Sequence, residues 1–150
     1  MFDALKIAAS GMSASRQMMD VIAENIANAN TTMTISGEPY KRKDVVLAAQ
    51  NINQENNDDI LTVSFDEEYE KQIAGVEVAN IKEANNGFRK VYDPTNPNAD
   101  KDGYVTLPNV NVVEEMAKMI QASRMYEANS TVVESIKNMA MKALELIQQQ

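Results

Sequence analysis

The sequence contains no cysteine, no histidine and no tryptophan among its 150 residues. The chain therefore has no thiol nucleophile, no imidazole general base and no disulfide, and zinc would lack its usual ligands. Glycine and proline are nearly confined to the middle: only Gly11 precedes Gly37, and neither residue type follows Pro108. Because these residues are the strongest breakers of regular structure, we expect long helices at both ends and an irregular or β-rich segment between them.

Positive charge is also scarce, with 14 Lys and Arg against 22 Asp and Glu and a net charge of −8. This balance argues against nucleic acid and anionic membranes as partners, because both attract clustered Lys and Arg. The acidic excess lies in residues 38–104, whereas the two ends are nearly neutral and can approach copies of themselves. No run reaches 18 apolar residues and no basic, apolar leader opens the chain, so neither a membrane-spanning helix nor a cleaved signal peptide is expected.

The N-terminal segment has the periodicity of a helix with one apolar stripe. Gly11 inside this helix costs roughly 1 kcal/mol relative to alanine, which suggests the close approach of another helix. The stripe could pack on the chain's own core or on other subunits, and periodicity leaves both open. The helix should end near Asn28. The stripe consists of Phe2, Leu5, Ala9, Met12, Met19, Ala23 and Ile26, with Arg16 in one stripe position and with Ala8, Ser15 and Ile22 widening it.

The middle segment favours a small antiparallel sheet with long loops. Two stretches are expected to be loops or turns: residues 51–59, rich in Asn and Asp, as an exposed or mobile loop, and residues 93–98 as a turn. The candidate strands are short runs of β-forming residues at 45–47, 60–65, 76–78 and 88–92.

Two patterns in the middle segment could be mistaken for chemical sites. Residues 98–103 match the opening of a calcium-binding loop, but Asn109 stands where the bidentate Glu belongs, so a structural turn is favoured. The acids Asp66, Glu67, Glu68 and Glu70 form a charge run, which is more often a solvated surface than a catalytic pair. We therefore predict no catalytic residues, no cofactor, no metal and no small-molecule substrate.

The C-terminal segment predicts a second long helix. Pro108 precedes it, Asn109 or Asn111 can cap it, and two glutamates in its first turn favour the helix dipole. The predicted fold is α+β: an antiparallel, coiled-coil-like helix pair with a small central antiparallel β domain. The expected segments are the N-terminal helix at 1–33, the β-rich outer domain at 34–108 and the C-terminal helix at 109–150, the two helices together forming an inner domain.

Two long motifs carry a family resemblance. Residues 2–32, with Ala8-Ala9-Ser10-Gly11-Met12 and Ala23-Glu24-Asn25-Ile26-Ala27-Asn28, resemble the N-terminal motif of bacterial flagellar rod and hook proteins. Residues 103–116 and 122–129 resemble the matching C-terminal motif. The chain length and the sequences of residues 39–43 and 91–94 resemble those of the proximal rod proteins of the FlgC family.

This resemblance implies a structural subunit of the flagellar basal-body rod in the periplasm, exported by the flagellar type III system without a cleaved signal peptide. Such proteins assemble helically, through their terminal helices, into a hollow shaft that transmits torque. The implied partners are other rod proteins, copies of this chain, and the adjoining membrane-ring or export-gate components.

The expected assembly interface lies on the two terminal helices. Two other classes of function remain open: a helical protein-binding module that forms a discrete complex, and a hydrolase that uses Asp66 or Glu68. The interface residues predicted from the stripes are Phe2, Leu5, Ala9, Gly11, Met12, Met19, Ile22, Ile26, Val113, Met116, Ile120, Tyr126, Val133, Ile136, Ala140 and Leu144.

Overall fold

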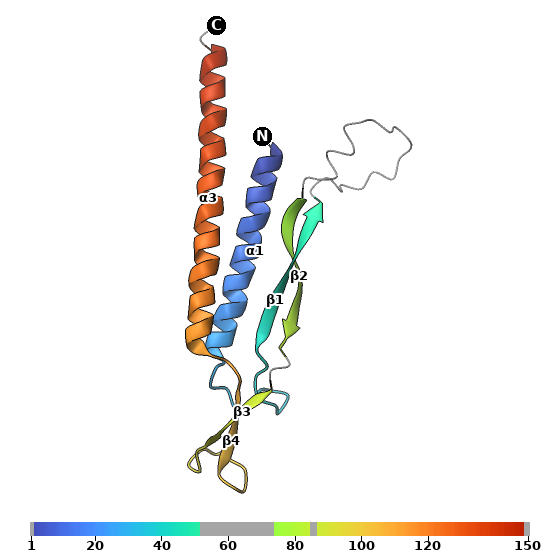
Figure 1. Cartoon of the computed structure of the whole chain (residues 1–150), viewed down its shortest axis with the longest axis vertical. Helices are drawn as coiled ribbons and strands as arrows, with labels where there is room; N and C mark the ends of the chain where they lie inside the picture. The colour runs from blue at the N-terminus through green and yellow to red at the C-terminus, as the bar shows by residue number, and fades with distance from the viewer. Residues whose placement is uncertain (1, 52–73, 85–86, 149–150) are drawn as a thin grey trace, which may run out of the picture. The chain divides into compact units, whose positions relative to one another are not determined.

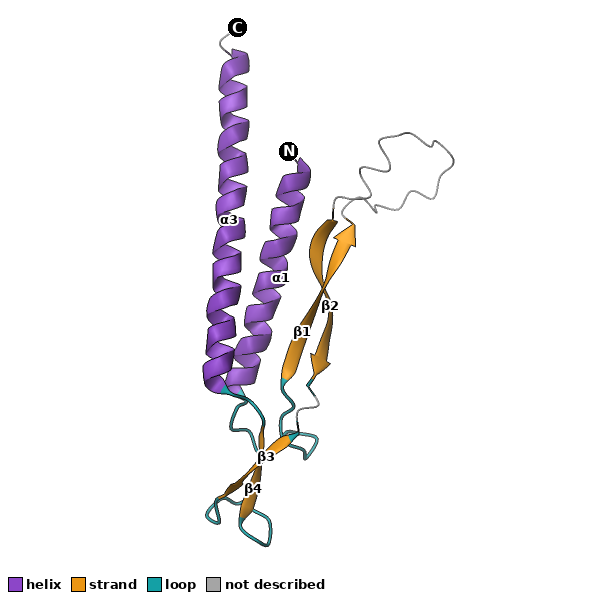
Figure 2. Ribbon diagram, in the orientation of Figure 1, coloured by secondary structure: helices purple, strands orange, loops and turns teal. Residues whose placement is uncertain are grey.

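The computed structural model describes residues 2–51, 74–84 and 87–148 of the chain, and these contain two helices and four strands (Figures 1 and 2). This is the α+β class expected from the sequence. The predicted strand at 60–65, most of the predicted loop at 51–59 and the acids at 66–70 lie outside the described residues. The elements are α1 (Phe2–Ala27), β1 (Lys43–Asn51), β2 (Ala74–Glu83), β3 (Phe88–Tyr92), β4 (Tyr104–Pro108) and α3 (Val112–Gln148).

Both helices begin, and α1 ends, where local chemistry favours it. Helix α1 has Asp3 in its first turn and stops at Ala27, where the Asn28 side chain donates a hydrogen bond to the Glu24 carbonyl at 2.9 Å. Helix α3 is capped by Asn111, whose Oδ1 accepts the Val113 amide at 3.1 Å. Of the two predicted caps, Asn111 is therefore the one used. No helix in the described ranges is both long and apolar enough to cross a membrane.

The four strands form two separate two-stranded sheets. Strands β1 and β2 pair with each other and run in opposite directions in Figure 2. Strands β3 and β4 form an antiparallel hairpin whose register pairs Phe88 with Pro108 and Tyr92 with Tyr104. The predicted runs at 45–47, 76–78 and 88–92 all lie in strands, whereas β4 was not among the predicted strands.

The loop formed by residues 93–103 joins β3 to β4, and the calcium-like pattern lies in its last turn. Asp100 Oδ1 accepts the backbone amides of Asp102 at 3.0 Å and of Tyr104 at 2.8 Å, so this carboxylate shapes the turn. Gly103 has a φ of +79°, and an added Cβ would come within 2.9 Å of the Tyr92 ring. Both its conformation and its surroundings therefore require glycine.

The described chain divides into two compact units, each of which contains part of α1 and part of α3. Of the described residues, the first unit contains 2–16, 47–51, 74–79 and 123–148, and the second contains 17–46, 80–84 and 87–122. This division differs from the expected inner and outer domains, which stay a prediction. Within the first unit, Ser10 Oγ accepts the Val76 amide at 3.1 Å, which links α1 to β2.

The side chains that are buried within the chain lie one position away from much of the predicted stripe. In α1 the buried positions include 8, 15, 22 and 25, whereas Ala9 and Ala23 are exposed. In α3 the buried positions are 115, 122 and 136, whereas Met116 and Ser130 are exposed. Positions 8, 15 and 22 of α1 and 115, 122 and 136 of α3 recur at seven residues or a multiple of seven, the period of the predicted stripes, but the residues that had been taken to widen the α1 stripe are at its centre.

Candidate assembly surfaces and the buried polar network

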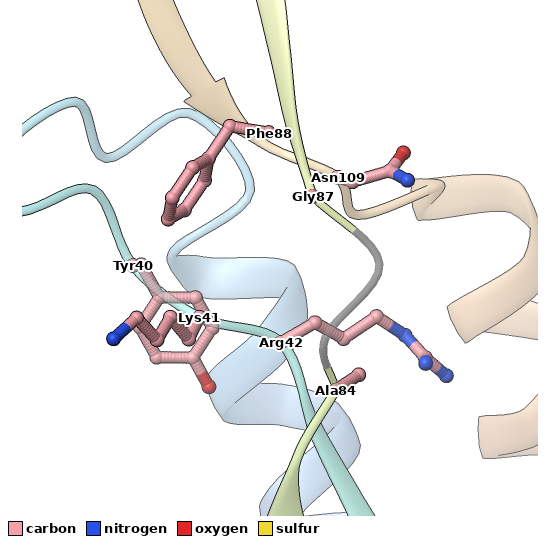
Figure 3. A pocket seen from close by; sticks show the side chains of 7 residues that line it. All are labelled: Tyr40, Lys41, Arg42, Ala84, Gly87, Phe88 and Asn109. Carbon is pink, nitrogen blue, oxygen red and sulfur yellow. The ribbon is translucent and has the colours of Figure 1, made fainter.

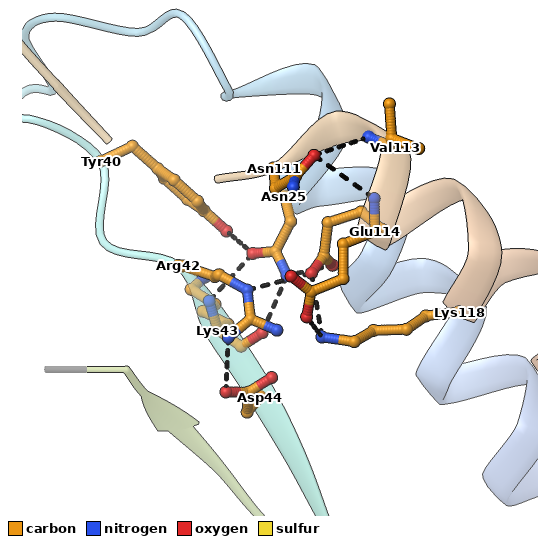
Figure 4. A network of polar contacts seen from close by, with 10 residues as sticks. Asn25, Tyr40, Arg42, Lys43, Asp44, Asn111, Val113, Glu114 and Lys118 are labelled. Atoms are coloured by element: carbon orange, nitrogen blue, oxygen red, sulfur yellow. Dashed lines mark hydrogen bonds and ion pairs between the residues drawn. The ribbon is translucent and has the colours of Figure 1, made fainter. Parts of the chain in front are cut away.

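A buried polar network joins three distant parts of the sequence in the second unit (Figure 4). Asn25 of α1 is 1% exposed and uses its whole side-chain amide. Its Nδ2 donates to the Lys43 carbonyl at 2.8 Å and to Glu115 Oε2 at 3.0 Å. Its Oδ1 accepts the Tyr40 hydroxyl and the Lys43 amide, each at 2.9 Å. One amide side chain therefore holds α1, the segment entering β1, and α3 together.

Glu115 is the second centre of the network, and its side chain is 1% exposed. Besides Asn25, it accepts hydrogen bonds at Oε1 from Arg42 Nε at 3.0 Å and from Lys118 Nζ at 3.3 Å. A buried carboxylate is tolerated only when it is paired and hydrogen-bonded, and these three donors meet that condition. In the described part of the chain, every buried side-chain nitrogen and oxygen has a hydrogen-bond partner.

The environment shifts the protonation of both acidic members of this network. Burial would raise the pKa of Glu115, but hydrogen bonds from Asn25 and Arg42, with the charges of Arg42 and Lys118, outweigh it and lower that pKa. Burial, followed by the negative charges of Glu24 and Glu115, raises the pKa of Tyr40 to about 12. At neutral pH Glu115 is therefore ionised and Tyr40 is a neutral hydrogen-bond donor.

The lowered pKa of Glu115 predicts that acid destabilises the second unit. The unfolded carboxyl has its ordinary pKa of 4.5, so the unfolded chain takes up this proton before the folded chain does. The stabilisation is therefore fully present above pH 4.5, and it is lost as the pH falls from there through the pKa that Glu115 has in the folded chain. We expect the urea midpoint, followed by circular dichroism, to drop over this window.

The variant Glu115→Gln is the control for this acid effect. It should be less stable than the parent at neutral pH, because Arg42 and Lys118 then face an uncharged group. Its urea midpoint should also change less with pH below 4.5. If the urea midpoint changed equally with pH below 4.5 in the parent and in Glu115→Gln, Glu115 would not be the group responsible for the loss of stability.

A shallow pocket of about 190 Å³ lies beside the network (Figure 3). Lys41 and Arg42 line it together with Tyr40, Phe88 and Asn109. Lys41 is paired with Glu38 at 2.9 Å, and Arg42 with Asp44 at 2.7 Å as well as with Glu115. Because both cations are already neutralised by carboxylates of the chain, the pocket gives no support for an anionic small-molecule ligand.

The predicted interface residues fall into three groups by exposure. Two of them, Ile22 and Ile136, are buried within the chain. Six are half-buried: Gly11, Met12, Met19, Ile26, Val133 and Ala140. The other eight are exposed, namely Phe2, Leu5, Ala9, Val113, Met116, Ile120, Tyr126 and Leu144.

Gly11 lies against α3 in the first unit. A Cβ at Gly11 would be 2.7 Å from Asn129 Nδ2 and 3.0 Å from Asn129 Cγ. Real Cβ atoms essentially never come that close to another atom. The side chain of Asn129, on α3 of the same chain, therefore occupies the space beside Gly11, whereas a role for Gly11 in assembly stays a prediction.

Sequence reasoning missed the polar network altogether. The signal was the phase of the stripes: Asn25 and Glu115 occupy buried positions of α1 and α3, where a polar residue needs a partner. Because the predicted stripe lies one position away from the buried one, the predicted role of Glu115 is only that of a negative charge in the first turn of the helix.

Comparison with known proteins identifies the family. Residues 5–32 match the family model described as "Flagella basal body rod protein", and residues 101–146 match the C-terminal model "Flagellar basal body rod FlgEFG protein C-terminal". The flagellar basal-body rod protein FlgC of Borreliella burgdorferi is 41% identical over 152 residues, covering 99% of this chain and 98% of that protein. The chain belongs to the FlgC family of flagellar basal-body rod proteins.

Other FlgC proteins cover the chain almost as fully. That of Bacillus subtilis is 40% identical and covers 97% of both chains, and that of Salmonella typhimurium is 36% identical and covers 93% of this chain and 92% of its own. This rod protein is therefore a structural subunit of the flagellar basal body, in a family that is not an enzyme family, and it assembles with other rod components.

Proposed function

We propose that this rod subunit assembles helically with copies of itself and with related rod proteins through α1 and α3, forming a hollow shaft that transmits torque. The observation that carries this proposal is the exposure of large apolar side chains along both helices. Phe2 is 81% exposed, Val113 76% and Ile147 71%. Exposed apolar surface of this extent is typical of a protein that is completed by its partners.

The C-terminal end of α3 shows this exposed apolar surface most clearly. In the first unit Gly11 faces Asn129, and the two helices run in opposite directions, so the start of α1 at Phe2 lies opposite about position 138. Residues 139–148 of α3 therefore extend beyond α1, as Figure 1 shows. We call these residues the α3 overhang. Its exposed apolar side chains are Met139, Met141, Leu144, Leu146 and Ile147.

Such an end is poorly stabilised by the chain alone. Isolated helical segments of this length are marginal in water, and most helix stability comes from packing an apolar face. Neighbouring subunits would supply the surface on which this apolar face packs. The contacts in a helical assembly are head-to-tail, so different surfaces of the subunit must meet, and many such contacts together resist the shear that torque imposes.

The proposal extends to the place and route of assembly. It sets the subunit in the periplasmic part of the rod, next to membrane-ring or export-gate components, after passage through the flagellar type III system without a cleaved signal. The family membership supports this setting.

The α3 overhang can be tested in assembled basal bodies. We expect the double variant Leu144→Asp/Ile147→Asp to reduce the amount of this chain in detergent-extracted, salt-washed basal bodies by about tenfold or more, because burying the carboxylates in an apolar contact is costly. The amount is measured by quantitative mass spectrometry relative to the other rod proteins.

Ser135→Asp/Asn138→Asp is the matched control, because it adds the same charge to exposed positions of α3 before the overhang. Its incorporation should equal that of the parent chain. Normal incorporation of the overhang variant would exclude the overhang from the interface. If the parent chain is missing from washed basal bodies that retain the other rod proteins, a discrete helical complex becomes the better explanation.

A further inference from the structure

A groove opens in the second unit where α1, β1 and α3 meet. Its volume is about 250 Å³. A cavity of roughly 150 Å³ accommodates benzene, so this groove has room for one or two aliphatic side chains. We call it the α1–β1–α3 groove. Its polar rim includes Lys43, Asp44 and Lys118, and its apolar lining is Met18, Val21 and Ile22 of α1 with Val45 of β1.

The charges on the rim are already paired within the chain. Lys118 contacts Glu114 at 2.9 Å and Glu115 at 3.3 Å. Lys43 pairs with Glu24, and Asp44 with Arg42. An apolar side chain can therefore enter the groove without stripping water from an unpaired charge, which would be the costly step.

An apolar stripe lies on the other side of α3 in the same unit. Val113, Met116 and Ile120 are 76%, 52% and 62% exposed. They share one face of the helix by their spacing of three and four residues, and we call them the α3 outer stripe. At about 100° per residue, this face points roughly 180° away from the face that carries Glu115 and Lys118 at the groove. The ion pair between Arg124 and Glu127 ends the stripe.

We propose that the α3 outer stripe of one copy of this chain docks in the α1–β1–α3 groove of the next copy. The dimensions agree: at about 1.5 Å per residue, positions 113–120 span about 10 Å, and the groove's α3 wall, positions 115–121, spans about 9 Å. The groove has room for one or two of the three exposed apolar side chains of the stripe, and its floor is apolar.

The placement of the two surfaces favours a second copy of the chain as the occupant. The stripe and the groove lie on opposite faces of one helix, so each copy that docks its stripe presents an open groove to a further copy. A contact of this kind is heterologous, and it continues into a ring or a helical array instead of closing as a dimer. This inference rests on the proposed assembly function and assigns one of its contacts.

Engineered cysteines can test the contact directly, because the chain has no cysteine of its own. Met18→Cys is placed in the groove and Ile120→Cys in the stripe, and intact basal bodies are treated with a short bismaleimide. We expect the variant with both cysteines to give a ladder of cross-linked copies. In cells that express the two single variants together, dimers should form and longer species should not.

Three results would overturn the proposed contact. The first is dimers formed by Ile120→Cys alone, which would show that stripes pair with each other. The second is a cross-link from the cysteine at position 120 to a lysine of a different rod protein, formed with a cysteine-to-lysine cross-linker and identified by peptide mass spectrometry. The third is an absent ladder although the variant is present in washed basal bodies, and in that case the structural role in the rod stands while this contact fails. Asn138→Cys with Met18→Cys is the control pair, and it should give no ladder.

A charge on the stripe provides a second measurement. Ile120→Glu should lower incorporation into washed basal bodies about tenfold or more, because the carboxylate would be buried in the groove. Position 120 is exposed in the single chain, so the urea midpoint of the isolated protein should be unchanged. Adding Met18→Lys, which places a cation in the facing groove, should restore part of the loss. Normal incorporation of Ile120→Glu would contradict the contact.

Discussion

Asn25→Asp is expected to destabilise the second unit by about 3 kcal/mol or more, although the two side chains have almost the same shape. The Asn25 amide donates to the Lys43 carbonyl and to Glu115, and aspartate can donate to neither. A second carboxylate would lie about 3.0 Å from the first, at a site that is 1% exposed. Urea unfolding followed by circular dichroism measures the loss.

Two companion variants identify the cause of the stability loss in Asn25→Asp. Asn25→Asp/Glu115→Gln should recover part of the stability, because a glutamine amide can donate to the new aspartate. Asn138→Asp, at an exposed position of α3, should stay within about 0.5 kcal/mol of the parent. A free energy of unfolding for Asn25→Asp within about 1 kcal/mol of the parent would show that Asn25 does not hold the second unit together.

Lowering the pH should reduce the difference in stability between the parent chain and Asn25→Asp. In the parent chain, acid removes the stabilisation provided by ionised Glu115. In Asn25→Asp, two adjacent carboxylates share the site, so one of them binds a proton more readily and can then donate a hydrogen bond. The difference in stability between parent and variant should therefore shrink as the pH falls below about 5.

The helices and turns of this chain follow from local chemistry that can be read from its sequence. The absence of glycine and proline predicts α3, Asn111 caps it, and Asp100 and Gly103 shape the turn before β4. These features depend on residues close together in the sequence, so no knowledge of the packing is needed. The long family motifs lie in the same two helices.

The phase of the apolar stripes could not be derived in the same way. Helix α3 has apolar side chains on two opposite faces: one, with Ala122, packs within the chain, and the other, with Val113 and Ile120, is exposed. A periodic pattern with two faces does not say which one is buried. The network was missed for a related reason, because Asn25 and Glu115 look like surface residues until the two helices are paired.

Gly11→Leu is expected to disrupt the pairing of α1 with α3 in the first unit and to lower the amount of this chain in basal bodies. Even a Cβ at this position would be 2.7 Å from Asn129 Nδ2, and leucine adds three more carbons. Forcing extra carbon atoms into a packed contact typically costs about 1–3 kcal/mol. Urea unfolding of the isolated chain and mass spectrometry of washed basal bodies measure the two effects.

The partner side chain provides the decisive comparison. Asn129→Ala removes the three atoms nearest to position 11, so Gly11→Leu/Asn129→Ala should be more stable than Gly11→Leu alone. Gly11→Ala should bring little or no gain beside Asn129, but should stabilise the Asn129→Ala chain by up to about 1 kcal/mol, the difference in helix propensity. Ser13→Leu, at an exposed position of α1, is the control for added apolar surface. If Gly11→Ala stabilises both backgrounds equally, the close approach of Asn129 is not the reason for glycine at this position.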